Sequence, residues 1–156
     1  MTKPEDGIKI VAQNRRATHD YFVEDRFEAG IVLVGSEIKS IRAGQVQLRE
    51  AYVRAEGREV LLLNAHIAAY DPAAGQNHPP LRPRKLLLHR RQINKLMGAI
   101  EREGMTVVPL KIYFNDKGRA KVEIALAKGK KLHDKRESEK KRDWTRERGR
   151  LLRQKD

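Results

Sequence analysis

The chain has 156 residues, and its 34 Lys and Arg against 21 Asp and Glu give a formal net charge of +13 and a pI near 10.2. This length suits one domain with an appendage, and the charge favours a polyanionic partner, with nucleic acid ahead of an acidic membrane surface. The sequence contains no cysteine, which excludes disulfides, thiolate metal sites and cysteine catalysis. It has neither an apolar signal segment nor a run of about 18 apolar residues, so we expect a soluble cytoplasmic protein with no membrane partner.

The N-terminal part of the chain predicts strands followed by a short helix. Residues 8–14 alternate apolar and polar side chains, and residues 21–35 contain two β-rich runs separated by charge. Both patterns are typical of strands. In residues 36–44, Ser36 is a candidate cap and Gly44 a candidate stop, so we expect a short helix there.

The middle of the chain predicts a hairpin and then a loop. One strand is expected at residues 51–55, a turn at residues 56 and 57, and a second strand at residues 60–67. Together with the preceding strands this would form a β meander. Residues 71–85 contain four prolines and show no periodicity, which favours a loop.

A second helix is predicted from apolar periodicity. Ile93, Leu96, Met97 and Ile100 recur at i, i+3, i+4 and i+7, and Gly104 follows them. This spacing places the four side chains on one face, so we expect an amphipathic helix of about 13 residues.

The last apolar part of the chain predicts another hairpin. Two alternating runs flank the turn sequence "NDKG", namely Leu110, Ile112 and Phe114, then Val122, Ile124 and Leu126. Short antiparallel strands with two or three helices indicate a mainly β protein. We therefore expect residues 1–127 to form a small OB-like antiparallel β-barrel, closed or partly closed so that few strand edges stay exposed.

Residues 128–156 form a basic C-terminal tail. This segment carries net +7, whereas residues 1–127 carry net +6, so the tail is more than four times as basic per residue. Such charge density predicts a tail that is disordered when free. Trp144, Arg148, Leu151 and Leu152 are spaced at i, i+4, i+7 and i+8, which places them on one face of a latent helix at about 143–153. An ordinary solubilising tail is the alternative.

An enzyme is disfavoured by the absence of a recognisable site. The acidic side chains that could bind Mg²⁺ are scattered without two-metal spacing, namely Asp20, Glu24, Asp25 and Glu28. The sequence also lacks a phosphate-binding loop, a metal-binding His pair and a nucleophile elbow. We expect no enzymatic activity, no metal site and no cofactor. A ribosomal or general RNA-binding protein without preference for one RNA remains an alternative from composition.

Three separated segments carry a family resemblance. They are "NRRATHDYFVEDRFEAGIVLVGSEIKSIRAG", "RPRKLLLHRRQI" and "LAKGKKLHDKR". In this order they resemble the small protein B family, the SsrA-binding proteins of bacteria, from about residue 8 to the end. The resemblance implies an OB-like barrel that binds the tRNA-like domain of tmRNA. With tmRNA it would enter stalled ribosomes and rescue them by trans-translation.

The resemblance also implies RNA-facing residues in the barrel, namely Asn14, Glu28 and Leu87. A carboxylate on such a surface can accept hydrogen bonds from a guanine edge or a 2′-hydroxyl. For Glu28 the alternative is an ion pair with a nearby Arg, and for Leu87 it is a place in the core. Lys128, Lys130 and Lys131 correspond to the junction of barrel and tail, where phosphate contacts are expected.

In the tail, the resemblance assigns ribosome contacts. His133, Asp134, Lys135 and Arg136 match a family motif that acts after RNA delivery, although a lone His in a charged tail is usually only solvated. The latent-helix face of Trp144, Arg148, Leu151 and Leu152 would lie in the vacant mRNA channel of the small subunit, against its rRNA.

Overall fold

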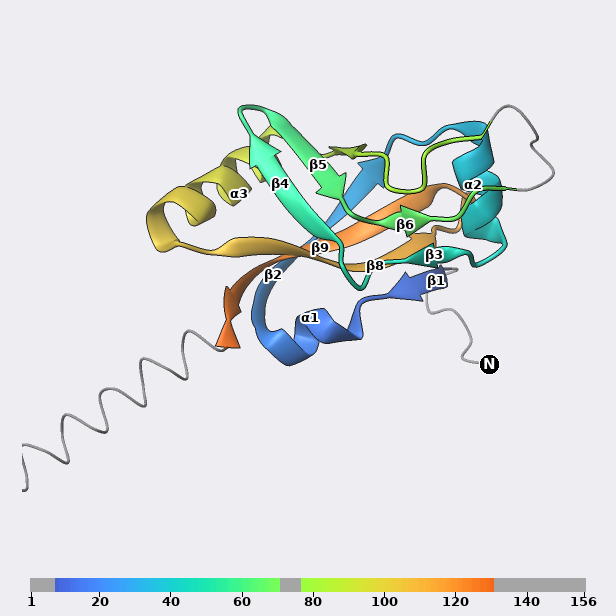
Figure 1. Cartoon of the computed structure of the whole chain (residues 1–156). Helices are drawn as coiled ribbons and strands as arrows, with labels where there is room; N and C mark the ends of the chain where they lie inside the picture. Colours follow the sequence, from blue (N-terminus) through green and yellow to red (C-terminus); the bar gives the residue numbers. More distant parts are fainter. Residues whose placement is uncertain (1–7, 71–76, 131–156) are drawn as a thin grey trace, which may run out of the picture.

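The computed structural model describes residues 8–70 and 77–130, and all structural statements concern these residues (Figure 1). The helices are α1 (Arg15–Asp20), α2 (Gly35–Arg42) and α3 (Arg90–Glu103). The strands are β1 (Lys9–Gln13), β2 (Tyr21–Ile31), β3 (Val46–Gln47), β4 (Tyr52–Glu56), β5 (Glu59–Leu63), β6 (His66–Ile67), β7 (Arg84–Leu87), β8 (Thr106–Phe114) and β9 (Ala120–Gly129). Over this part of the chain, no helix is long and apolar enough to cross a membrane.

Seven strands form one antiparallel sheet in the order β1-β8-β9-β2-β7-β5-β4, and β3 pairs with β6 separately. The sheet curls so that β4 lies against β8 (Figure 1). A mainly β fold with three helices is therefore confirmed. The barrel, however, is not closed by backbone hydrogen bonds between β4 and β8 within the described residues.

The open seam has a local cause in β8. Pro109 has no N–H to donate, and its carbonyl accepts a hydrogen bond from the Asn14 side chain at 3.1 Å. The Asn14 N–H donates to the Leu110 carbonyl at 2.7 Å. This edge of β8 is thus occupied by the chain entering α1, so of the expected arrangements, closed or partly closed, the structure has an open, curled sheet packed by side chains.

The core fills the concave side of the sheet. Alternation in β8 and β9 points Ile112, Val122 and Ile124 inward, and α3 adds Leu96; all four side chains are fully buried. A smaller cluster lies on the other side of the sheet, where Ala17 of α1 packs against Val108, Leu110, Ala125 and Ala127. Helix α1 therefore covers one end of the outer face and leaves the rest open.

Most predicted elements are present with small shifts. The helix ending at Gly104 spans Arg90–Glu103, and Gly104 caps it in the left-handed region with φ of 63°. The predicted helix in residues 36–44 is α2, but Val34 is its N-cap and Ser36 lies inside it. The two runs in residues 21–35 form one strand with a register shift between Val23 and Arg26.

Four features differ from the sequence expectation. Helix α1 was not predicted. Strand β7 begins at Arg84, inside the segment expected to be a loop. The strand expected at residues 60–67 is broken at Asn64, whose φ of 58° turns the chain between β5 and β6. Strand β9 also continues to Gly129, so the first two residues of the expected tail pair with β2. The division at residues 127 and 128 stays a prediction.

Candidate nucleic-acid interface

The outer face of the sheet, beyond the part that α1 covers, brings together polar side chains from β2, β8 and β9 and one apolar side chain from β7. Cross-strand register places Glu28 of β2 opposite Glu123 of β9, and Glu123 opposite Lys111 of β8. Tyr113, two residues after Lys111, points to the same face because the intervening Ile112 is in the core. We call this region the outer face and define it by Arg26, Glu28, Leu87, Lys111, Tyr113, Lys121 and Glu123.

Glu28 is exposed, as an RNA-contacting carboxylate must be. Its Oε2 accepts a hydrogen bond from the Tyr113 hydroxyl, and the structure records no ion pair of Glu28 with any described residue. The ion pair with Arg, considered from the sequence, is therefore not its arrangement here. Burial, and then the bond to the Glu28 carboxylate, raise the pKa of Tyr113 well above its ordinary value. The phenol thus remains a hydrogen-bond donor at neutral pH.

Glu123 has the cationic partners that Glu28 lacks. Its Oε1 lies 3.3 Å from Arg26 Nη1 and its Oε2 lies 3.6 Å from Lys111 Nζ. Lys111 also lies over the Tyr113 ring, 5.6 Å from its centroid. Two carboxylates in direct register would otherwise repel each other, so these cations balance the pair.

Leu87 is on the surface and not in the core, with 53% of its area exposed. It pairs with Gly30 of β2, where an added Cβ would come within 3.2 Å of the Leu87 Cβ. Both residues line a groove of about 390 Å³, and Arg42, Arg119 and Lys121 are among its other lining residues. Leu87 therefore offers an apolar contact that is surrounded by cationic side chains.

Lys121, Arg119 and Arg42 were not singled out from the sequence. The signal for Lys121 was available, since the alternation that buries Val122 and Ile124 places it on the opposite face. In the structure Lys121 lies opposite Gly30 and Tyr113. Gly30 in turn lies opposite Leu87 on β7. Arg42 belongs to α2, and its position near β2 depends on tertiary packing that the local sequence does not predict.

Asn14 is almost buried, and both ends of its amide are used. Its Oδ1 accepts from the Ala17 N–H at 3.3 Å, which caps α1, and its Nδ2 donates to Pro109. Asn14 borders a hollow together with Arg26 and Lys111. Its structural role is clear from these bonds, and a direct RNA contact stays a prediction.

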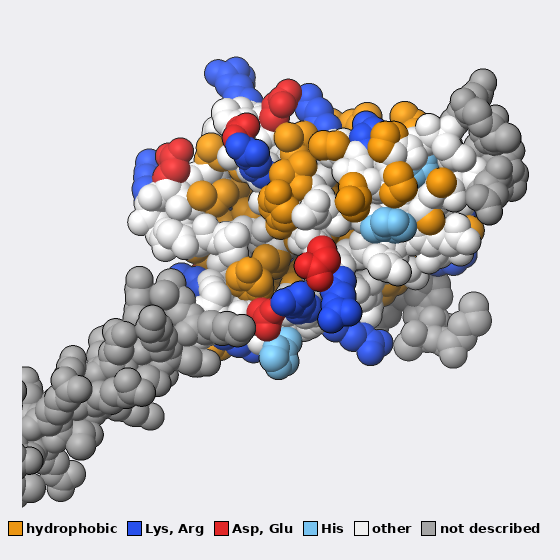
Figure 2. Space-filling view, in the orientation of Figure 1, with side chains coloured by type: hydrophobic (Ala, Val, Ile, Leu, Met, Phe, Trp, Pro, Cys, Tyr) orange, Lys and Arg blue, Asp and Glu red, His pale blue; other side chains and the backbone are white. Residues whose placement is uncertain are grey.

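Helix α1 presents charge beside this hollow. Figure 2 shows Lys and Arg side chains gathered around α1, with acidic and His side chains among them. Arg16 pairs with Asp20 at 3.2 Å, and His19 contacts the same carboxylate at 2.9 Å. The bond with His19, and after it the bond with Arg16, hold the pKa of Asp20 below its usual value despite some desolvation.

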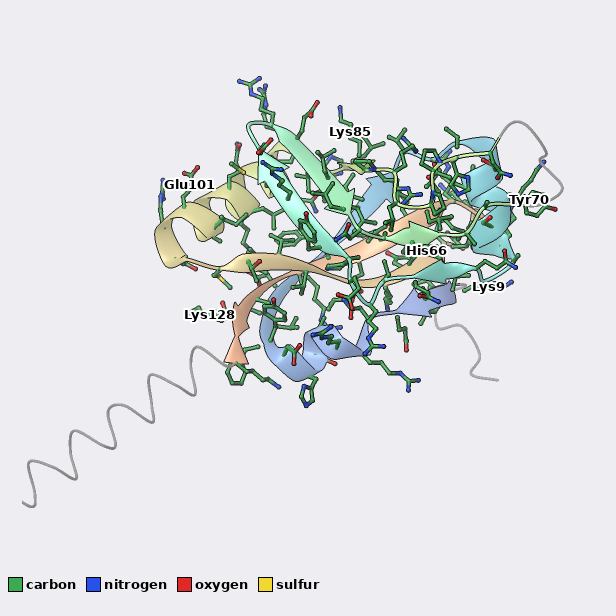
Figure 3. All side chains as sticks on the ribbon, viewed as in Figure 1. Lys9, His66, Tyr70, Lys85, Glu101 and Lys128 are labelled. Atoms are coloured by element: carbon green, nitrogen blue, oxygen red, sulfur yellow. The ribbon has the colours of Figure 1, made fainter. Side chains whose placement is uncertain are left out.

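The junction lysines lie at the far end of β9. Lys128 is half exposed, with its Nζ 3.7 Å from Glu24 Oε1, and Figure 3 shows it where β9 ends. Lys130 donates from Nζ to the Thr18 carbonyl at 3.1 Å and lies 5.2 Å from the centroid of the Phe22 ring. Both ammonium groups remain at the surface, where phosphate could reach them.

Several predicted site residues lie outside the described residues. They are Lys131, His133, Asp134, Lys135, Arg136, Trp144, Arg148, Leu151 and Leu152. The latent helix at about 143–153 lies there as well. Within residues 8–70 and 77–130, no group of three or more His, Asp or Glu side chains could hold a metal ion.

A buried ion-pair network fixes the loop that leads into β7. Glu37 and Arg84 are both fully buried, with Oε2 to Nε at 2.6 Å, and Arg82 Nη2 lies 2.5 Å from Glu37 Oε1. Burial by itself would raise the pKa of Glu37, but hydrogen bonds from Arg82, the Val34 N–H and Arg84 outweigh it and lower the pKa. The Arg84 guanidinium also donates to the carbonyls of Ala65 and Pro80, so the cluster ties the start of β7 to this loop.

On the exposed sheet face, cations surround one positioned carboxylate and one exposed leucine, and the chain carries a net charge of +13. Together these features define a nucleic-acid-binding β protein. Comparison with known proteins identifies a particular family within this class. A family model described as "SmpB protein" matches residues 11–154, and the chain belongs to this family.

Curated relatives cover nearly the whole chain. An SsrA-binding protein of Rhodopseudomonas palustris (strain TIE-1) is 62% identical over 151 residues, which cover 97% of this chain and 96% of that protein. The SsrA-binding protein of strain HaA2 is 64% identical with the same coverage. That of Nitrobacter winogradskyi is 62% identical, again with the same coverage.

A solved structure resembles the fold described above. It bears the description "tmRNA-SmpB: a journey to the center of the bacterial ribosome" and is 49% identical in sequence, with a TM-score of 0.63. The match covers 76% of this chain and 82% of that one.

Proposed function

We propose that this protein binds tmRNA through its tRNA-like domain, carries it to stalled ribosomes and supports trans-translation there. The observation that carries the proposal is membership of the SmpB family together with the exposed outer face. Relatives described as SsrA-binding proteins and a solved structure described with tmRNA and the ribosome support both partners.

The outer face and the groove beside it have separate chemical tasks in RNA binding. Lys121, Arg119 and Arg42 would neutralise phosphates around the groove. Glu28 would accept hydrogen bonds from a base edge or a 2′-hydroxyl, which phosphate contacts alone cannot discriminate. Leu87 would cover the face of an unstacked base or sugar. This combination suits a folded RNA with exposed nucleotides better than a regular duplex.

The basic tail is proposed to act later, on the ribosome. His133 to Arg136 would contact rRNA after delivery, and the face of Trp144, Arg148, Leu151 and Leu152 would lie in the empty mRNA channel. The protein would thus work by binding, without catalysis and without a cofactor, in the cytoplasm where ribosomes are stalled.

The first experiment measures what RNA the protein selects. The purified full-length chain is titrated with a tRNA-like-domain RNA and with an unrelated hairpin of equal length at several salt concentrations. We expect tight binding to the tRNA-like RNA, with affinity falling as salt rises because counterions are released. Glu28→Ala should weaken this binding with little change in melting temperature. Equal affinity for both RNAs would instead support a general RNA-binding protein.

A second experiment separates the two stages. Deletion of residues 133–156 should leave affinity for the tRNA-like RNA nearly unchanged and abolish tagging of a nascent chain on a stalled ribosome. Replacing Leu151 and Leu152 together by Asp should reproduce the tagging defect, whereas Lys155→Ala, which keeps that apolar face, serves as the control. Normal tagging by the double-Asp variant would overturn the proposed role of the tail.

A further inference from the structure

Tyr113 stands out because it connects two strands that are not neighbours. It belongs to β8, and its bond partner Glu28 belongs to β2, with β9 between them. Across β9 the register places Tyr113 opposite Lys121, and Glu28 opposite Glu123. The phenol side chain therefore reaches diagonally over β9 to the carboxylate.

The ring of Tyr113 is held firmly, so its hydroxyl has a fixed position. The residue is only 3% exposed, its neighbour Ile10 lies opposite on β1, and Lys111 covers the ring. Lys111 is in turn fixed by Glu123. A buried ring loses little further freedom when its hydroxyl binds a carboxylate, so the bond restricts Glu28 at small entropic cost.

Glu28 is left with one oxygen for a ligand. Its Oε2 accepts from Tyr113, and Oε1 has no protein hydrogen bond or ion pair among the described residues. The neighbouring carboxylate of Glu123 has cations at both oxygens and so is satisfied by the protein itself. The two acidic side chains of the outer face thus have different tasks, which the alternation of apolar and polar residues along their strands does not distinguish.

On the basis of the proposed function, we propose that Tyr113 is a positioning residue for RNA recognition, which holds the Glu28 carboxylate so that Oε1 faces an N–H or O–H donor of the bound RNA. Without the phenol, Glu28 would rotate freely on an exposed strand and would have to be ordered again on binding. The partner of Oε1 is a donor such as a base amino or imino group or a 2′-hydroxyl. Tyr113 itself does not touch the RNA.

A double-mutant cycle tests this proposal on the full-length chain. The variants are Tyr113→Phe, which keeps the ring and removes the hydroxyl, Glu28→Ala, and the two combined. Tyr52→Phe is the matched control, because Tyr52 is exposed and no hydrogen bond of its hydroxyl is recorded among the described residues. Affinity for the tRNA-like RNA and melting temperature are measured for each variant.

The expected result is non-additivity in RNA affinity. Tyr113→Phe should raise the Kd about five- to tenfold, as expected for the cost of ordering one flexible side chain on binding, and should have no further effect in the Glu28→Ala background. Tyr52→Phe should bind as the parent does. A merely structural bond between β8 and β2 would lower the melting temperature of Tyr113→Phe without this dependence on Glu28.

Two outcomes would overturn the inference while leaving the proposed function intact: unchanged affinity of Tyr113→Phe, or the same fold-loss in the presence and absence of Glu28. If the parent protein does not prefer the tRNA-like RNA over the hairpin and Glu28→Ala is neutral, the proposed function itself fails, and the role of Tyr113 fails with it. These results are separable because the parent and Glu28→Ala are measured in the same series.

Discussion

Removal of the Glu37 carboxylate should be one of the most damaging single changes to the fold. In Glu37→Ala, the Arg84 guanidinium would remain fully buried and keep the Ala65 carbonyl at 2.6 Å, but it would lose its only carboxylate partner among the described residues. Breaking a buried pair in this way costs about 3–5 kcal/mol, since a charge is left without compensation. Domains of this kind are stable by only about 5–15 kcal/mol. The loss would therefore be a large fraction of the total.

The assay is urea unfolding followed by far-ultraviolet circular dichroism. Circular dichroism is chosen because it reports on the strands directly, whereas the one tryptophan of the sequence, Trp144, lies outside the residues that the structure describes. The matched control is Glu56→Ala, which breaks the exposed pair with Arg54 and should cost no more than about 1 kcal/mol. If Glu37→Ala and Glu56→Ala destabilise the protein equally, the buried network does not hold the fold as the distances indicate.

Three further predictions concern pH, packing and ionisation. The pKa of Glu37 is lowered on folding from 4.5, so its contribution to stability is present above that pH and is lost as pH falls through the lower folded pKa. When urea unfolding is measured at pH 5, 4 and 3, Glu37→Gln should therefore lack this pH-dependent loss of stability. Gly30→Ala should push Leu87 aside, weaken RNA binding and cost about 1 kcal/mol in urea unfolding, while Gly98→Ala, where an added Cβ meets nothing within 4 Å, should be neutral or stabilising. Because the pKa of Tyr113 is raised above the ordinary 10.0, its ring signals in an NMR titration should stay unchanged through pH 10.5, when exposed tyrosines have begun to ionise.

The elements that the sequence predicts well are those with local causes. The helix over Arg90–Glu103 follows from its own apolar face and from Gly104, and the β8–β9 hairpin follows from alternation on both sides of a short turn. For both elements, the residues that determine the structure lie within about 25 positions of one another. Helix α1 has only six residues, and its cap Asn14 is held by Pro109, 95 residues away, so no local signal is strong enough to predict it.

The candidate site was predictable only in part, because some of its contacts join residues that are far apart in the sequence. Family resemblance pointed to Glu28 and Leu87, and the structure places both on the exposed outer face. The bond between Tyr113 and Glu28 joins residues 85 positions apart, so it depends on strand order, which alternation does not specify. Sequence alternation also left open whether the barrel is closed or partly closed; within the described residues the sheet is not closed, and Pro109 and Asn14 occupy the strand edge that closure would need.

Strand β9 gives the two proposed stages of action a physical separation. Lys121 lies near its start, beside the groove with Leu87, whereas Lys128 lies near its end, beside Glu24. The eight residue steps from 121 to 129 span about 26 Å at the usual rise of a strand. An RNA bound over the groove can therefore leave the exit point of the tail uncovered, and the tail can meet a second RNA surface while the first is still held. Phosphate contacts at Lys128 and Lys130 would then belong to the edge of the tmRNA interface, so their loss should weaken binding less than loss of Lys121 does.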